Sequence, residues 1–204
     1  LGAGDPPAAR RVVARARATA ERRDMLRLRV QADVLAVHAF AAHVCRAADP
    51  EADAVARRLR DSVATLGNVR LASDASLALA ALALSRGDAR SAHAAAVRVV
   101  DEARRGPRRR TLLEARLLEV ASLTALGEAA SARLAFEAAL ALAMHEGWLQ
   151  PFVDCGPSVR EWFSLDATPV RPLRVRDRFL ESIERATRRV AAPEPALALS
   201  ERER

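Results

Sequence analysis

Apolar residues return every three or four positions along most of this chain, which is the spacing that places them on one face of an α-helix. The pattern runs to about residue 146, with short polar, glycine or proline breaks between the apolar stretches. Ala, Leu, Arg and Glu, which favour helices, are abundant, whereas long β-branched runs are missing. The sequence therefore predicts an all-α fold.

The breaks divide the chain into a series of predicted helices. Asp49 is placed as the N-cap of the third helix, with Pro50 at its first position. The last helix carries Val175, Phe179 and Ile183 on one face. The predicted helices cover residues 6–23, 24–47, 50–66, 71–86, 89–104, 108–126, 129–145 and 174–190.

An internal repeat is the clearest feature of the middle of the chain. Gly87–Ala92 and Gly127–Ala132 each contain a Gly, then an acid, then an Ala five positions after the Gly, and they lie forty residues apart. We expect the Gly to end one helix in the left-handed conformation and the acid to lie in the first turn of the next helix. The small Ala would let two helix backbones approach closely.

The second copy resembles the second half of a tetratricopeptide repeat, because Phe136 and Ala139 continue its pattern. The first copy has Ala96 and Val99 at the corresponding positions. The resemblance implies antiparallel helix pairs over residues 1–146 that stack into a right-handed superhelix, an α-solenoid with a concave face.

In a tetratricopeptide-like frame, the first helix of each pair lines the concave groove. This frame predicts a ligand groove, and the competing interpretation is that the same side chains are ordinary surface or capping groups. The candidate groove residues are Asp74, Ser85, Glu114 and Thr124.

The character of the sequence changes after Glu146. Residues 147–190 form a predicted closing segment and last helix, and a short helix is expected to start at Asp154 or Gly156. Clustered aromatic side chains could form a ligand platform or a hydrophobic plug over the last repeat, and the need of a terminal repeat for a closing surface favours the plug. The aromatic cluster comprises Trp148, Phe152, Trp162 and Phe163.

The sequence of residues 191–204 indicates a proline-containing linker that is followed by the first residues of another helix. Ser200 and Glu203 have the spacing of a capping box, which marks a helix start. We therefore expect a further domain to begin here.

Three features in this order resemble the MalT-like branch of LuxR-type transcription regulators: the helix pairs, the Gly147–Pro157 segment, and a terminal Leu-Ser-x-Arg-Glu. Leu199, Ser200, Arg202 and Glu203 match the start of that family's helix-turn-helix domain. The resemblance implies an upstream ATP-binding module and a downstream DNA-binding domain. It implies for this chain a sensor and coupling role without catalysis or a cofactor of its own, acting on a small-molecule effector or a protein.

The composition of the chain limits the functions that it can have. The net charge is +7, and all 33 basic residues are Arg. A nucleic-acid face is one interpretation of this charge, but the spread of the Arg residues favours solvated helix faces. No phosphate-binding loop that requires Lys can exist here. No apolar run reaches the ~18 residues of a membrane span, and a cytoplasmic location is expected.

The cysteines and histidines provide an alternative hypothesis of another class. Cys155 could be a nucleophile at a helix start, with His145 as the nearest histidine in sequence, but no protease or hydrolase signature accompanies them. His38, His43 and Cys45 share one predicted helix without the i,i+4 spacing of metal ligands, which favours core or partly exposed histidines. A protein–protein scaffold without a small ligand is the other alternative.

Overall fold

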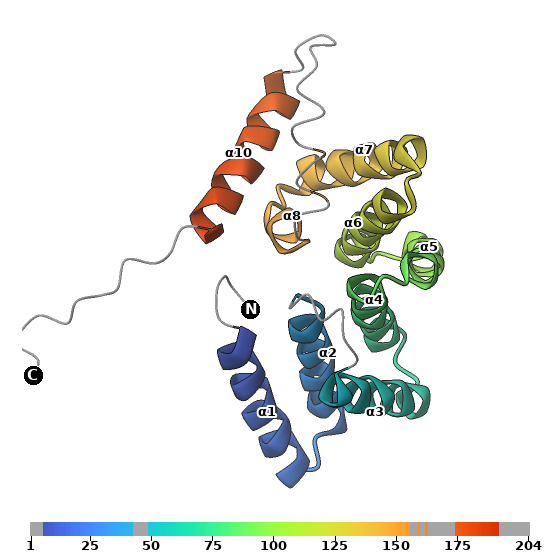
Figure 1. The fold of residues 1–204 in the computed structure, drawn as a ribbon, viewed down its shortest axis with the longest axis vertical. Helices are drawn as coiled ribbons and strands as arrows, with labels where there is room; N and C mark the ends of the chain where they lie inside the picture. Colours follow the sequence, from blue (N-terminus) through green and yellow to red (C-terminus); the bar gives the residue numbers. More distant parts are fainter. Residues whose placement is uncertain (1–5, 43–48, 156–158, 160–161, 163–173, 192–204) are drawn as a thin grey trace, which may run out of the picture.

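The computed structural model describes residues 6–42, 49–155, 159, 162 and 174–191 (Figure 1). Every regular element in this part of the chain is an α-helix, and none is a strand, which confirms the all-α prediction. None of these helices combines the length and apolarity needed to cross a membrane. The helices are α1 (Pro6–Arg22), α2 (Leu26–Ala42), α3 (Pro50–Leu66), α4 (Val69–Ser85), α5 (Ala89–Arg104), α6 (Arg109–Leu126), α7 (Ala129–Glu146), α8 (Gln150–Asp154) and α10 (Arg174–Ala191).

Two helix starts show how local chemistry sets the boundaries. The Asp49 carboxylate accepts hydrogen bonds from the backbone N–H groups of Glu51 (2.9 Å) and Ala52 (3.3 Å), which confirms it as the N-cap of α3. The second predicted helix begins two residues late, at Leu26, because Asp24 has φ 50° and turns the chain between α1 and α2. Asp tolerates this left-handed conformation better than most residues.

The repeat glycines occupy the predicted turns. Gly87 and Gly127 have φ values of 90° and 78°, a region that residues with a Cβ rarely enter, so each ends its helix as expected. The acids lie one position earlier than predicted, because Asp88 and Glu128 are N-caps rather than first-turn residues. Of the two, only Asp88 caps with its side chain, accepting from the Ser91 N–H at 3.1 Å.

Each helix from α1 to α7 packs against the next one along the chain, and a second set of contacts joins alternate helices. α2 contacts α4, α4 contacts α6, and α6 contacts α8, so these four helices form an inner row. α3, α5 and α7 lie outside that row, and the whole follows an arc (Figure 1). The sequence prediction of paired helices is thereby confirmed.

Both small and large residues are buried between the helices. Ala92 and Ala132, the matching alanines of the two repeat copies, are completely buried, and this lets neighbouring helices approach closely. Phe136 is 1% exposed and packs in a core that reaches from α6 to α10. A separate apolar core, which includes the ring of Phe40, lies between α2, α3 and α4. The apolar interior therefore runs the length of the molecule in successive clusters.

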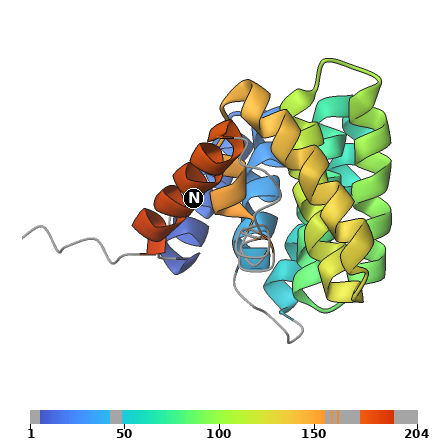
Figure 2. The ribbon, with the colours of Figure 1, turned by 90° about the horizontal axis from the view of Figure 1, so that it is seen from above.

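The C-terminal helices differ in part from the prediction. The short helix α8 starts at Gln150, with Pro151 supplying the fixed φ that suits a first turn, and it was not predicted from the sequence. The short helix expected to start at Asp154 or Gly156 falls largely outside the described residues. α10 lies beside α8 in both views (Figure 1, Figure 2), where Phe179 meets Phe152 edge to face at 6.4 Å. Ile183 is fully buried, so the predicted apolar face of the last helix makes contact. The side chain of Val175 lies outside the described residues.

A buried carboxylate joins the three N-terminal helices. Asp33 of α2 is 2% exposed, and it accepts from Arg17 of α1 at 3.0 Å and pairs with Arg58 of α3 at 3.5 Å. Burial raises the pKa of Asp33 above its ordinary value, although both guanidinium groups act to lower it. The Asp33 side chain thus links α1, α2 and α3 through ion pairs.

Candidate functional site

Two of the predicted groove residues lie on neighbouring helices of the inner row. Asp74 is on α4 and Glu114 is on α6, forty positions apart, at the same place in the repeat. Both are half-buried, between apolar neighbours such as Ala75 and Ala115 that are almost completely buried. The two carboxylates therefore lie at the border between the buried core and solvent, on the adjacent inner helices α4 and α6.

Glu114 has a partner of opposite charge and neighbours of like charge. Arg110 donates to its carboxylate from Nε at 3.0 Å, one helical turn away. Burial is the main influence that raises the pKa of Glu114, and the carboxylates of Asp74 and Asp154 raise it further. Arg110 opposes these influences without cancelling them. Glu114 is therefore a carboxylate that gains from a further hydrogen-bond donor.

Asp74 is in a similar position with more basic neighbours. Burial raises its pKa, and Arg70, Arg108 and Arg110 partly offset that rise. Arg108 is also committed elsewhere, because its guanidinium donates to the Ser73 hydroxyl at 2.9 Å. Two inner-row acids with raised pKa values thus lie within electrostatic range of each other.

The first and last helices of the inner row complete the set. Asp154, at the end of α8, acts electrostatically on Glu114 of α6 and on His38 of α2. Burial lowers the pKa of His38, and Asp154 partly restores it. Gln150 donates to Asp154 from Nε2 at 2.8 Å. We call His38, Asp74, Glu114 and Asp154 the inner-face set, since α2, α4, α6 and α8 contribute one residue each.

The inner-face set has the chemistry of a binding site for a polar molecule. Its carboxylates accept hydrogen bonds, and its imidazole both donates and accepts when neutral. Partial burial strengthens the interactions of His38, Asp74 and Glu114, whereas Asp154 is exposed. Within the described ranges, no three His, Cys, Asp or Glu residues come together in a way that could hold a metal ion. The set therefore suits a ligand rich in hydrogen-bond donors.

Ser85 and Thr124 are not part of this set. Each lies ten or eleven positions from its acid along the same helix, a separation of about 15 Å. The Ser85 hydroxyl donates to the Leu82 carbonyl at 2.8 Å. The Thr124 hydroxyl donates to the Val120 carbonyl at 2.8 Å and accepts from Trp162 Nε1 at 2.9 Å. The hydrogen bonds of both residues are therefore structural ones.

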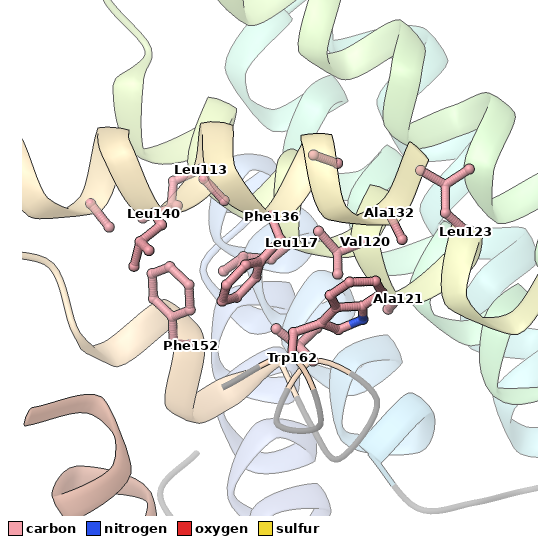
Figure 3. Packing of buried hydrophobic residues seen from close by; sticks show 14 of the residues in the cluster. Leu113, Leu117, Val120, Ala121, Leu123, Ala132, Phe136, Leu140, Phe152 and Trp162 are labelled. Atoms are coloured by element: carbon pink, nitrogen blue, oxygen red, sulfur yellow. The ribbon is translucent and has the colours of Figure 1, made fainter. Parts of the chain in front are cut away.

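The aromatic cluster fills the core at the C-terminal end (Figure 3). Phe152 is completely buried and meets Phe136 edge to face at 6.4 Å, while Trp162 lies 6.3 Å from Phe136. Trp148 is half-buried against the same cluster. Phe163 lies outside the described residues. Rings this deeply packed close the end of the array and leave no face of Phe152 for a ligand.

The remaining candidates are dispersed. Cys155 is half-buried, and its thiol donates to the Phe152 carbonyl at 2.9 Å. His145 is exposed in the last turn of α7. His43 and Cys45 lie outside the described residues, as do the helix-turn-helix match residues Leu199, Ser200, Arg202 and Glu203.

Sequence reasoning missed His38 and Asp154 as members of the site. The sequence indicates a core or partly exposed histidine at His38, and it involves Asp154 only as a possible helix start and as part of the Gly147–Pro157 segment. The repeat itself carries the relevant information. If the helices that carry Asp74 and Glu114 face inward, the corresponding helices before and after them, α2 and α8, are expected to face inward as well. No sequence spacing could place α8 near α2, since that approach depends on the curvature of the array.

A scan against protein-family models finds no match for this chain, and comparisons with curated proteins and with solved structures find none either.

Proposed function

We propose that this chain is the sensor and coupling part of a LuxR-type transcription regulator of the MalT-like branch. In this proposal the helix pairs form a right-handed superhelix, an α-solenoid, whose inner face binds a small-molecule effector in the cytoplasm. An upstream ATP-binding module and a downstream DNA-binding domain would respond to the bound effector. The chain itself would do no chemistry and would need no cofactor.

The observation that carries the proposal is the pairing of Asp74 and Glu114 across α4 and α6, with raised pKa values that arise from burial. Half-burial of two neighbouring acids costs stability unless they have enough donors, so their place at matching repeat positions is an argument for a ligand. Asp154 and His38 extend the same polar surface over four helices. An effector bound here would contact α2, α4, α6 and α8 together.

The coupling mechanism follows from the inner row. A ligand that binds four helices at once favours the curvature in which those helices are closest, and it shifts the population toward that curvature. α8 also carries Phe152, which α10 contacts through Phe179. A change in α8 would therefore reach the last described helix, which precedes the expected DNA-binding domain.

Thermal-shift screening of the chain against a metabolite library, followed by isothermal titration of the hits, tests this proposal. We expect a saturable ligand whose dissociation constant rises by at least about tenfold in the double variant Asp74→Asn/Glu114→Gln. Glu128→Gln, in the outer turn between α6 and α7, is the matched control and should bind as the parent does. No stabilising compound, or a hit unaffected by the double variant, would contradict the proposal.

The protein–protein scaffold remains the second candidate, and one observation favours it. Large apolar side chains are exposed on α1 and α2. A scaffold would use such a surface without any small molecule.

A further inference from the structure

Exposed apolar side chains gather at the N-terminal end of the molecule. Among the described residues, seven large apolar side chains are exposed, and five of them lie on α1, α2 or the turn between these helices. Leu28 and Leu35 are each 45% exposed and lie two helical turns apart, so they share one side of α2. Such a concentration typically marks an interaction surface. The five residues are Val12, Met25, Leu26, Leu28 and Leu35.

An open depression of about 480 Å³ lies between α1 and α2 beside these residues. Ala16, Thr19 and Ala20 of α1 line it with small side chains, and Met25 and Leu28 contribute apolar ones. A hollow between two helices, lined by small residues, accepts the ridge of side chains of a third helix.

The charge around the depression is strongly positive. Residues 10–29 include eight Arg and only two acids. Arg17 is held by Asp33 and Glu21, and Arg29 by Asp24. Arg15 and Arg23 line the depression, and neither forms an ion pair with another described residue. A partner for this surface must therefore bring acidic groups together with apolar ones.

We propose that the α1–α2 face, defined by Val12, Arg15, Arg23, Met25, Leu28 and Leu35, binds an acidic amphipathic helix of a partner protein. A leucine-like side chain of that helix enters the depression, and flanking Asp or Glu residues pair with Arg15 and Arg23. The bound helix continues the packing of the array, in which α4 has a neighbour on each side but α2 has only α4 within the inner row. This site shares no residue with the inner-face set and does not depend on the effector proposal.

The charge and shape distinguish this partner from other occupants. A second copy of the chain would bring the same Arg residues to the interface, and like charges repel. Nucleic acid would pair with Arg15 and Arg23 but would leave Met25 and Leu28 in contact with phosphates or water. A membrane surface favours apolar side chains that project, whereas Met25 and Leu28 border a hollow.

The test uses the whole chain and a fluorescent helical peptide of about 18 residues, with Leu on one face and Glu on its flanks. Two comparison peptides are the same composition in shuffled order and a version with Lys in place of Glu. Fluorescence anisotropy should show saturable binding of the Glu peptide alone. Raising the salt concentration from about 0.05 M to about 0.5 M should weaken binding. Absence of saturable binding, or equal binding of the shuffled peptide, would overturn the proposal.

Variants locate the site. Leu28→Ser/Leu35→Ser should raise the dissociation constant of the Glu peptide at least about tenfold. Arg15→Glu/Arg23→Glu should reverse the preference toward the Lys peptide, and because both residues are exposed this variant keeps the core intact. Leu134→Ser on α7, which is 74% exposed in the parent, is the matched control and should change nothing.

Three further results would overturn the choice of partner. A parent chain that dimerises in sedimentation experiments, and loses this on Leu28→Ser, would assign the face to a second copy. Leu28-dependent binding to vesicles of phosphatidylserine and phosphatidylcholine, without binding of the Glu peptide, would assign it to membranes. Arg15-dependent binding to duplex DNA, again without peptide binding, would assign it to nucleic acid.

Discussion

The two ends of the helix array each have an apolar core, but they differ in what surrounds it. At the N-terminal end, Asp33 joins three helices through Arg17 and Arg58, and large apolar side chains remain exposed. At the C-terminal end, Phe136 and Phe152 are buried with Trp162 in one cluster. A charged network can tolerate water at its edge, whereas an aromatic core requires its exclusion. The C-terminal end is therefore covered by its own side chains, whereas the N-terminal end leaves apolar side chains exposed to solvent.

The two tryptophans allow the ends to be measured separately. Trp148 and Trp162 both belong to the C-terminal cluster, so intrinsic fluorescence reports on that end. Circular dichroism at the helix band reports on the whole chain. Different local stabilities would appear as different midpoints of unfolding in urea.

The largest expected effect is that of Phe152→Ala. Removing a completely buried ring leaves a cavity among Phe136, Leu140 and Phe179, and such changes cost about 3–5 kcal/mol. The fluorescence midpoint in urea should fall further than the midpoint from circular dichroism. Leu134→Ala, on an exposed position of α7, should leave both midpoints unchanged. Equal shifts of both signals would mean that the two ends unfold as one unit.

The next effect is that of Arg17→Met. It removes the 3.0 Å hydrogen bond to the buried Asp33 carboxylate, whose remaining partner is Arg58, and it also removes the more exposed ion pair with Glu21. We expect a loss of about 1–3 kcal/mol at about pH 7, visible by circular dichroism before fluorescence. Arg22→Met is the control, because Arg22 is exposed on the same helix. A fluorescence midpoint that moves as far as the circular-dichroism midpoint would contradict the separation of the ends.

The pH dependence of Arg17→Met sharpens this test. Arg17 lowers the pKa of Asp33, so its removal moves that already raised pKa further above the ordinary value of 3.8. A carboxyl group with a raised pKa in the folded state adds stability below its ordinary pKa, and this contribution is lost as pH rises through the raised value. The destabilisation by Arg17→Met should therefore shrink between about pH 7 and about pH 4. A constant difference would mean that Asp33 does not titrate in this window.

The smallest effect concerns the closing contact of the aromatic end. Thr124→Val removes the acceptor of the Trp162 indole at 2.9 Å, and a hydrogen bond of this kind contributes about 1 kcal/mol. In a nitrogen–proton NMR spectrum, one of the two indole signals should move and the other should remain. Thr65→Val, at an exposed position of α3, is the control. A spectrum with both indole signals unchanged would contradict the contact.

Much of the fold could be predicted because it depends on local chemistry. The N-cap at Asp49 and the turns at Gly87 and Gly127 require only a few neighbouring residues, and the structure confirms them. The inward position of the helices that carry Asp74 and Glu114 could be anticipated from the repeat. The ligand that the sequence predicts for these acids stays a prediction.

The rest depends on contacts between distant segments. Ser85 shares a face of α4 with Asp74, so helical periodicity groups the two, whereas Thr124 is rotated by about 80° from Glu114 around α6. Both hydroxyl groups bond to carbonyls of their own helices, which only the structure shows. The role of Asp154 was equally hidden, because its influence on His38 depends on how far the array curves.

The spacing of the turn glycines determines which insertions and deletions the helix array can accommodate. Gly67, Gly87, Gly127 and Gly147 all have positive φ and stand twenty, forty and twenty positions apart. Each residue rotates an α-helix by about 100°, so deleting one residue inside α6 would swing every later side chain of that helix out of phase with its neighbours. Loss or duplication of forty residues would instead keep every interface in phase. Such a molecule can grow or shrink by whole hairpins, and its helices resist single insertions.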